Sequence, residues 1–148
     1  MIRLRRATQE DIPSILELVH ALAVFEKAPE EVTATVQDYV EKGFGDNPIF
    51  SCLLAYHDDQ LAGFSLWYYR FSTWKGKRLY LEDLYVKDDF RGKGIGQQLI
   101  EACIEEAKRT NCTGMMWQVL DWNTPAIEFY KRYNASFDGE WINVNLHL

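Results

Sequence analysis

The chain is poor in the residues that mark several other classes of protein. Its 148 residues include only three cysteines, four prolines and nine glycines. Cys52, Cys103 and Cys112 are an odd number and form no C-x-x-C pair, so they predict neither a disulfide framework nor a zinc site. The low glycine and proline content excludes a collagen-like or low-complexity chain.

Long apolar runs and an excess of basic residues are also lacking. No apolar run is long enough to span a bilayer, and no apolar segment of the signal-peptide kind follows the charged N-terminus. Twenty-two acidic residues against sixteen basic ones give a net charge of −6. Such a chain repels nucleic-acid phosphates at long range and attracts cationic small molecules. We therefore expect no membrane partner, no nucleic-acid partner, no metal, and a reducing, cytoplasmic setting.

What the chain does contain is typical of a globular domain. Hydrophobic residues make up 47% and charged residues 26% of the sequence. The length predicts one domain over residues 1–148.

The hydrophobic periodicity predicts a mixed α/β domain. Between residues 60 and 71, apolar side chains point to both faces, which favours a central strand covered on each side. A strand, a glycine-rich loop, a helix and a further strand then predict one crossover with its two strands parallel. The predicted strands cover residues 2–4, 50–56, 60–71, 78–86, 115–120 and 140–148, and the predicted helices cover about 12–26, 35–42, the segment after Gly96, and 123–133.

The most informative segment is the glycine-rich loop. Gly92, Gly94 and Gly96 stand at alternate positions between a predicted strand and a predicted helix. Such a loop brings backbone N–H groups and the helix N-terminus close to an anion, which suits a diphosphate. The simpler interpretation is a turn that only allows the helix to start. The P-loop pattern is absent, and Gln97 or Leu99 stands where a dinucleotide-binding fingerprint needs its last glycine.

The pattern Arg91-x-x-Gly94-x-Gly96 resembles the Q/R-x-x-G-x-G/A signature of the GNAT superfamily of N-acetyltransferases. Further stretches are similar to the diamine acetyltransferase branch, which acts on polyamines and thialysine. They include Phe25-Glu26-Lys27, Ser72–Gly76, Tyr80–Asp83, Leu120–Asn123 and Phe129-Tyr130-Lys131. The resemblance covers nearly the whole chain. It implies the GNAT fold, a mixed central sheet with helices on both faces, acetyl-CoA as co-substrate, a small cationic amine as acceptor, and a homodimer.

The resemblance also implies roles for individual residues. Tyr130 would protonate the leaving thiolate, and Glu82 would bind the amine and draw off its proton through water. The acceptor site would comprise Phe25, Glu26, Trp74, Glu82 and Asp83. The coenzyme contacts would comprise Leu84, Tyr85, Val86, Arg91, Gly92, Lys93, Gly94, Ile95, Gly96, Gln97, Asn123, Thr124, Pro125, Ala126 and Tyr130.

These residue types suit the chemistry. An alkyl amine has a pKa of about 10.4 and arrives protonated, so it needs a carboxylate to bind it and a route for its proton. Without the resemblance, Tyr130 at helical spacing would more often be a core residue. Asn134 stands where the family that the chain resembles usually has glycine, directly after the Tyr130 helix. Asparagine is the next-best residue for a left-handed cap. Two alternatives remain open: a non-catalytic CoA-binding module and a protein N-acetyltransferase.

Overall fold

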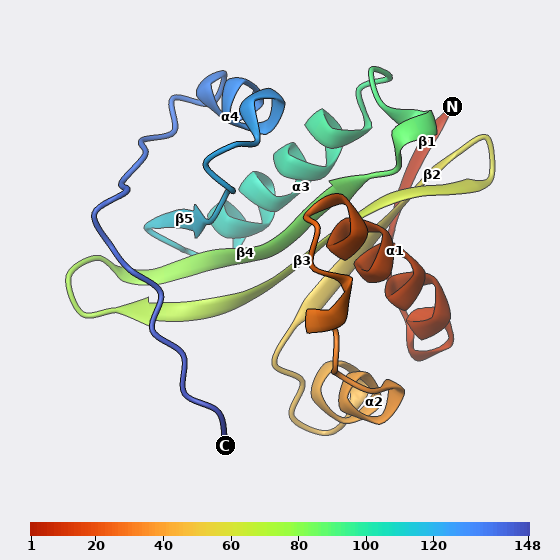
Figure 1. Cartoon of the computed structure of the whole chain (residues 1–148), viewed down its shortest axis with the longest axis horizontal. Coiled ribbons are helices and arrows are strands. Elements are labelled where there is room, and N and C mark those ends of the chain that lie inside the picture. The colour runs from red at the N-terminus through yellow and green to blue at the C-terminus, as the bar shows by residue number, and fades with distance from the viewer. The chain divides into compact units, whose positions relative to one another are not determined.

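The computed structural model of the chain describes residues 1–148, which form two compact units, residues 1–118 and 119–148 (Figure 1). The expectation of one domain stays a prediction, and each unit is described by itself. The first unit contains β1 (Ile2–Arg6), α1 (Ile12–Phe25), α2 (Val36–Phe44), β2 (Ser51–His57), β3 (Gln60–Ser72), β4 (Gly76–Val86), α3 (Ile95–Arg109) and β5 (Gly114–Trp117). The second unit contains α4 (Thr124–Lys131).

The sheet follows the chain in the order β1-β2-β3-β4-β5. The first four strands are antiparallel, and β4 and β5 are parallel, which confirms the predicted mixed sheet with one parallel pair. The parallel ladder joins only Arg78–Leu81 to Gly114–Trp117. On the β5 side, β4 therefore has no partner strand from Glu82 to Val86 in this unit.

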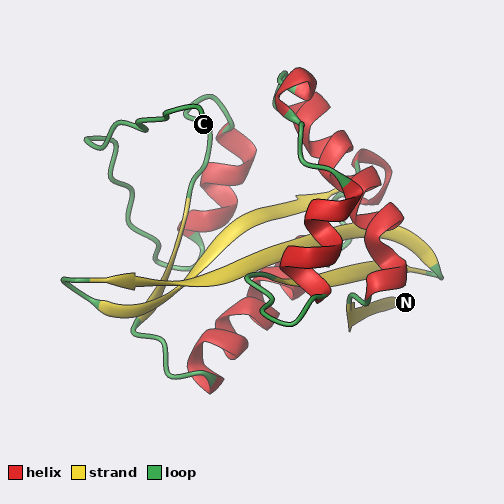
Figure 2. Ribbon diagram, turned by 90° about the horizontal axis from the view of Figure 1, so that it is seen from below, coloured by secondary structure: helices red, strands yellow, loops and turns green.

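Helices cover both faces of the sheet in the first unit (Figure 2), and its core lies on both faces. On one face, Ile15 and Leu18 of α1 pack against Leu54, Phe64 and Leu66. The other face is covered by α3, whose buried residues Leu99, Cys103 and Ala107 contact Ala55, Ala62, Trp67, Leu79 and Leu81. The predicted helices on both faces are confirmed.

A β-bulge interrupts the pairing of β3 with β4. Leu66 pairs with Asp83 and the next residue, Trp67, pairs with Leu81, so Glu82 has no partner on β3. In a regular strand, consecutive side chains point to opposite faces. Because a bulge inserts one unpaired residue, it breaks this alternation and re-aims the side chains around it. Glu82 and Asp83 therefore both reach the face covered by α1.

The C-terminal end of α1 is held by main-chain hydrogen bonds. Lys27 has a φ of 63°, the N–H of Lys27 donates to the Val24 carbonyl at 3.0 Å, and that of Ala28 donates to the Ala23 carbonyl at 2.9 Å. This pattern ends a helix sharply, although glycine usually takes the left-handed position. Glu26, the C-cap residue, is thereby held in a defined place.

In the second unit, α4 starts as the sequence predicts. The side-chain oxygen of its N-cap Asn123 accepts a hydrogen bond from the backbone N–H of Ala126, and Pro125 lies in the first turn. Asn134 has a φ of 57°, which confirms the predicted left-handed conformation.

The prediction of a last strand over residues 140–148 is wrong: this segment has no regular secondary structure. Its alternating apolar residues are exposed, as Ile142 and Val144 show. Alternation describes one face of a strand, but a strand also needs a neighbour for its backbone hydrogen bonds, and no ladder includes this segment. None of the helices combines the length and apolar character needed to cross a membrane.

Candidate functional site

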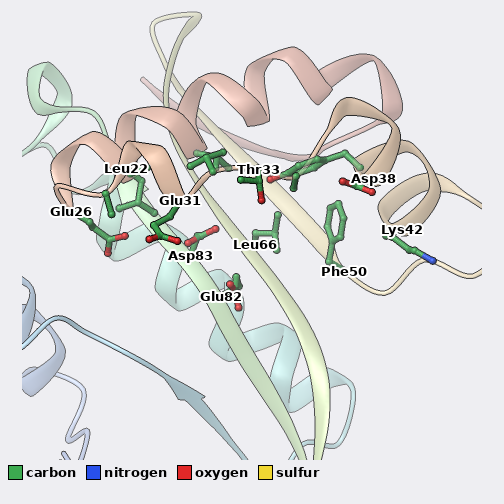
Figure 3. A pocket seen from close by; sticks show the side chains of 16 residues that line it. Leu22, Glu26, Glu31, Thr33, Asp38, Lys42, Phe50, Leu66, Glu82 and Asp83 are labelled. Atoms are coloured by element: carbon green, nitrogen blue, oxygen red, sulfur yellow. The ribbon is translucent and has the colours of Figure 1, made fainter. Parts of the chain in front are cut away.

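A cavity of about 490 Å³ opens in the first unit between α1, α2 and the middle of the sheet (Figure 3). Its lining is strongly acidic, with five carboxylates and one ammonium group. The charged lining residues are Glu26, Glu31, Asp38, Lys42, Glu82 and Asp83. A concave site with this balance attracts a small cation.

Glu82 and Asp83 line this cavity together because of the bulge in β4. The Tyr68 hydroxyl donates a hydrogen bond to the Glu82 carboxylate at 3.0 Å, which orients it. The Asp83 carboxylate has no hydrogen bond or ion pair within the chain, and the charges that act on it are those of Glu82 and Glu26. Burial, with the added repulsion of Glu82 and Glu26, raises the pKa of Asp83 to about 7. Burial also raises the pKa of Glu26. Their negative charges are thus costly until a cation arrives.

The remaining wall of the cavity is largely apolar. Leu22 of α1, Leu66 of β3 and Phe50 before β2 line it. The Phe50 ring meets the Tyr39 ring edge-on, with 5.7 Å between centroids. This wall suits the methylene chain of an alkyl amine, while the carboxylates take its charged end.

The residues that α2 contributes were not predicted as site residues. Asp38, Tyr39 and Lys42 line the cavity. The sequence predicts a helix here, and a capping box confirms its start: the Thr35 N–H donates to the Asp38 carboxylate at 2.7 Å, and the Thr35 hydroxyl accepts from the Asp38 N–H at 3.2 Å. The helical spacing of Tyr39, Val40 and Phe44 indicates which face of this helix packs on the core, but it does not indicate that the same helix lines a cavity with Asp38 and Lys42.

Two predicted acceptor-site residues lie outside this lining. Phe25 is the last residue of α1, next to the cavity residue Glu26, and packs against the core beneath it. Trp74 stands in the turn between β3 and β4 and is 81% exposed. Its indole is not part of the cavity wall, and its role stays a prediction.

The glycine-rich loop offers a row of unpaired amides. No hydrogen bond within the chain takes the backbone N–H groups of residues 92–97. Gly92 and Gly94 have φ values of 75° and 86°, and a Cβ on either would point into open space. Gly94 is also the N-cap of the fifteen-residue α3, so the positive end of the helix dipole faces this loop. These features fit the diphosphate of a coenzyme.

The basic side chains near the loop are partly engaged elsewhere. Lys87 pairs with Glu17 of α1, and Arg91 pairs with Asp88 at 2.9 Å. The Arg91 N–H donates to the Asp88 carbonyl, and its side-chain Nε donates to the Val86 carbonyl at 3.0 Å. The amides of residues 92–97 and the ammonium group of Lys93, which forms no ion pair, are therefore the groups most available to a diphosphate.

The predicted contacts to the coenzyme's amide-bearing arm fall on the unpaired edge of β4. Leu84, Tyr85 and Val86 lie beyond the last residue that pairs with β5. An unpaired strand edge can bind an extended ligand through main-chain hydrogen bonds.

The other predicted site residues lie in the second unit. Asn123 caps α4, and Thr124, Pro125 and Ala126 form its first turn. Tyr130 is the buried residue of this helix, and its ring lies 5.6 Å from that of Phe129.

The sequence matches known acetyltransferases over most of its length. The model of the Acetyltransferase (GNAT) family matches residues 12–135. The thialysine N-epsilon-acetyltransferase of Sus scrofa is 36% identical over 142 residues, which cover 90% of this chain and 84% of that protein. The spermidine/spermine N(1)-acetyltransferase-like protein 1 of Homo sapiens is 37% identical over 140 residues, covering 90% of this chain and 20% of that protein.

Solved acetyltransferase structures share the fold. The structure of an aminoglycoside acetyltransferase from an uncultured soil metagenomic sample superposes with a TM-score of 0.82 at 16% identity and covers 99% of each chain. The glycine-rich loop, the mixed sheet and the family match agree: the chain belongs to the acetyltransferase (GNAT) family and is an acetyl-CoA-dependent N-acetyltransferase.

Proposed function

We propose that the protein transfers an acetyl group from acetyl-CoA to a primary amine of a small cationic acceptor, either a polyamine or diamine or a lysine-like amino acid such as thialysine. The observation that carries this proposal is the cavity, in which five carboxylates face one lysine beside an apolar wall. Relatives named for thialysine and for spermidine/spermine support the same class of acceptor.

Glu82, Asp83 and Glu26 bind the ammonium group of the acceptor. Their carboxylates gain a partner for charges that burial and mutual repulsion make costly. Glu82, oriented by Tyr68, then accepts a proton from the amine through a water molecule. The neutral amine nitrogen is the nucleophile. Phe25 and Trp74 complete the acceptor site of this proposal.

The coenzyme is held mainly by backbone groups. The amides of residues 92–97 bind its diphosphate, with Arg91 at the base of the loop, and Leu84, Tyr85 and Val86 pair with its amide-bearing arm. Residues 123–126 add contacts from the start of α4. Acetyl-CoA supplies the acetyl group as an activated thioester.

Tyr130 gives a proton to the departing thiolate. A phenol of pKa about 10 and a thiol of about 8.5 differ by roughly 2 kcal/mol, a small deficit for a directed proton transfer. The two buried thiols support direct transfer without an acyl-enzyme. Burial raises the pKa of Cys52 to about 12 and that of Cys103 to about 11, which makes both poor nucleophiles.

The test is thiol release from acetyl-CoA with a panel of amines that includes polyamines, thialysine, lysine and an N-terminal peptide. We expect turnover with at least one small cationic amine, and the Tyr130→Phe variant should slow kcat about a hundredfold or more. Coenzyme binding without turnover on any amine would support a non-catalytic binding module instead. Preference for the peptide would support a protein acetyltransferase. We also propose a homodimer and a cytoplasmic location.

A further inference from the structure

Arg91 lies between the glycine-rich loop and the end of α1. Its guanidinium carbon is 4.9 Å from the centre of the Phe25 ring and 5.5 Å from that of the Tyr85 ring. The two rings are themselves 6.3 Å apart, centre to centre. A guanidinium over aromatic faces gains a cation–π attraction that lysine reproduces less well, because lysine lacks the planar group.

Two nitrogens of the same guanidinium have partners within the chain. Nε donates to the Val86 carbonyl at 3.0 Å, and one terminal nitrogen pairs with Asp88 at 2.9 Å. The side chain therefore joins three segments: the end of α1 through Phe25, the end of β4 through Tyr85 and Val86, and the start of the loop through Asp88. Two of its three nitrogens and its planar face contact the protein, although the side chain is 42% exposed.

The α1 end that Arg91 contacts carries a wall of the cavity. Glu26 directly follows Phe25, lines the cavity, and raises the pKa of Asp83 by its charge. The left-handed Lys27 and the hydrogen bonds of Lys27 and Ala28 make this end a single rigid turn. A shift of Phe25 therefore moves Glu26 relative to Asp83 on β4.

From this arrangement we infer that the Arg91 side chain is a positioning residue for the acceptor pocket: it fixes the α1 end, and with it Glu26, against β4. It acts on the acceptor through Phe25, while the loop amides bind the diphosphate. The expected change in the KM for the amine rests on the proposed function. The expected change in amide exchange at the end of α1 rests on the geometry alone.

The test compares Arg91→Met, which removes the guanidinium and keeps the stem, with Arg91→Lys, which keeps the charge. Both should raise the KM for the amine about five- to tenfold, because lysine cannot supply the planar contacts. The Kd for coenzyme A, measured by calorimetry, should change less than about threefold, since the amides of residues 92–97 remain. Arg109→Met removes another ion-paired arginine, at the far end of α3, and should leave both constants unchanged.

Phe25→Leu, which keeps Arg91 and removes the ring, tests the same contact from its other side. It should raise the KM for the amine. The double variant with Arg91→Met should have a KM no higher than that of the more affected single variant. A tenfold loss of coenzyme A affinity in Arg91→Met with an unchanged KM for the amine would overturn the inference, as would additive effects of the two substitutions.

Amide hydrogen exchange separates this inference from the proposed function. In Arg91→Met, the amides of Glu26, Lys27 and Ala28 should exchange about tenfold faster than in the wild type, and in Arg109→Met at the wild-type rate. If the wild type acetylates no amine, the proposed function fails, but this exchange result still decides the role of Arg91. Unchanged exchange at these three amides would refute it.

Discussion

The carboxylates of Glu82 and Asp83 line one cavity although the two residues are consecutive in a strand. The bulge opposite Leu66 and Trp67 makes this possible, because Glu82 is the residue without a partner on β3. In a regular strand, the side chains of two consecutive acidic residues would point to opposite faces of the sheet. Here they form one binding surface for a cation.

Removing either charge should weaken acceptor binding. Glu82→Gln and Asp83→Asn keep the shape of each side chain and should each raise the KM for the amine about ten- to thirtyfold, because a charge-assisted contact is lost. Steady-state kinetics with saturating acetyl-CoA measures this effect. Glu105→Gln, on the exposed face of α3, is the matched control and should behave as wild type. A KM that stays within twofold in both cavity variants would place the amine elsewhere.

The acceptor should bind more tightly as the pH rises through about 7. Burial and the neighbouring Glu82 and Glu26 raise the pKa of Asp83 from 3.8 to about 7, so at lower pH Asp83 is neutral and attracts a cation less. A plot of log KM for the amine against pH should fall through this range in the wild type and flatten in Asp83→Asn. An equal slope in the wild type and in Asp83→Asn would show that Asp83 does not cause the pH dependence of the KM.

The same shift predicts a pH-dependent stability. The folded chain holds a proton on Asp83 that the unfolded chain releases above pH 3.8. The resulting destabilisation is absent below that pH, grows as the pH rises, and is complete above about 7. Asp83→Asn should therefore gain stability over the wild type between pH 4 and pH 8, by about 2–4 kcal/mol, in urea unfolding. A gain that is the same at both pH values would show that Asp83 keeps its ordinary pKa.

Tyr68 should affect the acceptor only through Glu82. Tyr68→Phe removes the hydroxyl that donates to the Glu82 carboxylate and should raise the KM for the amine about two- to fivefold. In a Glu82→Gln background the same substitution should have little further effect, because the carboxylate it orients is gone. Independent, multiplicative effects would mean that Tyr68 acts on the acceptor directly.

Gly94 should matter for the coenzyme and not for the amine. Gly94→Ala places a Cβ at a φ of 86°, which costs about 1–2 kcal/mol and favours a different loop geometry. We expect the Kd for coenzyme A to rise about tenfold in calorimetry while the KM for the amine changes little. Gly139→Ala, at a glycine without positive φ or close neighbours, is the control. A Kd that Gly94→Ala leaves unchanged would argue against the loop as the diphosphate site.

Much of this architecture could be predicted because it follows from local chemistry. The apolar periodicity of residues 12–25 and the glycines of the loop predict α1 and the start of α3, and Asn123 and Asn134 bracket α4 through capping and the left-handed conformation. The parallel pair follows from the connection between β4 and β5.

Other features depend on contacts between distant residues. The bulge at Glu82 arises from its register with Leu66 and Trp67 on another strand. The part of α2 in the cavity depends on how an exposed helix packs on the sheet. The segment 140–148 has the alternation of a strand but no neighbour to pair with. Periodicity describes which side chains share a face, and it does not identify the partner of a strand.

The most direct test of the central claim is a crystal structure with coenzyme A and a small diamine bound together. We expect the diphosphate on the amides of residues 92–97 and an amine nitrogen within about 4 Å of the Glu82 or Asp83 carboxylate, the range of an ion pair. A diphosphate bound away from the loop, or an amine bound outside the acidic cavity, would contradict that claim.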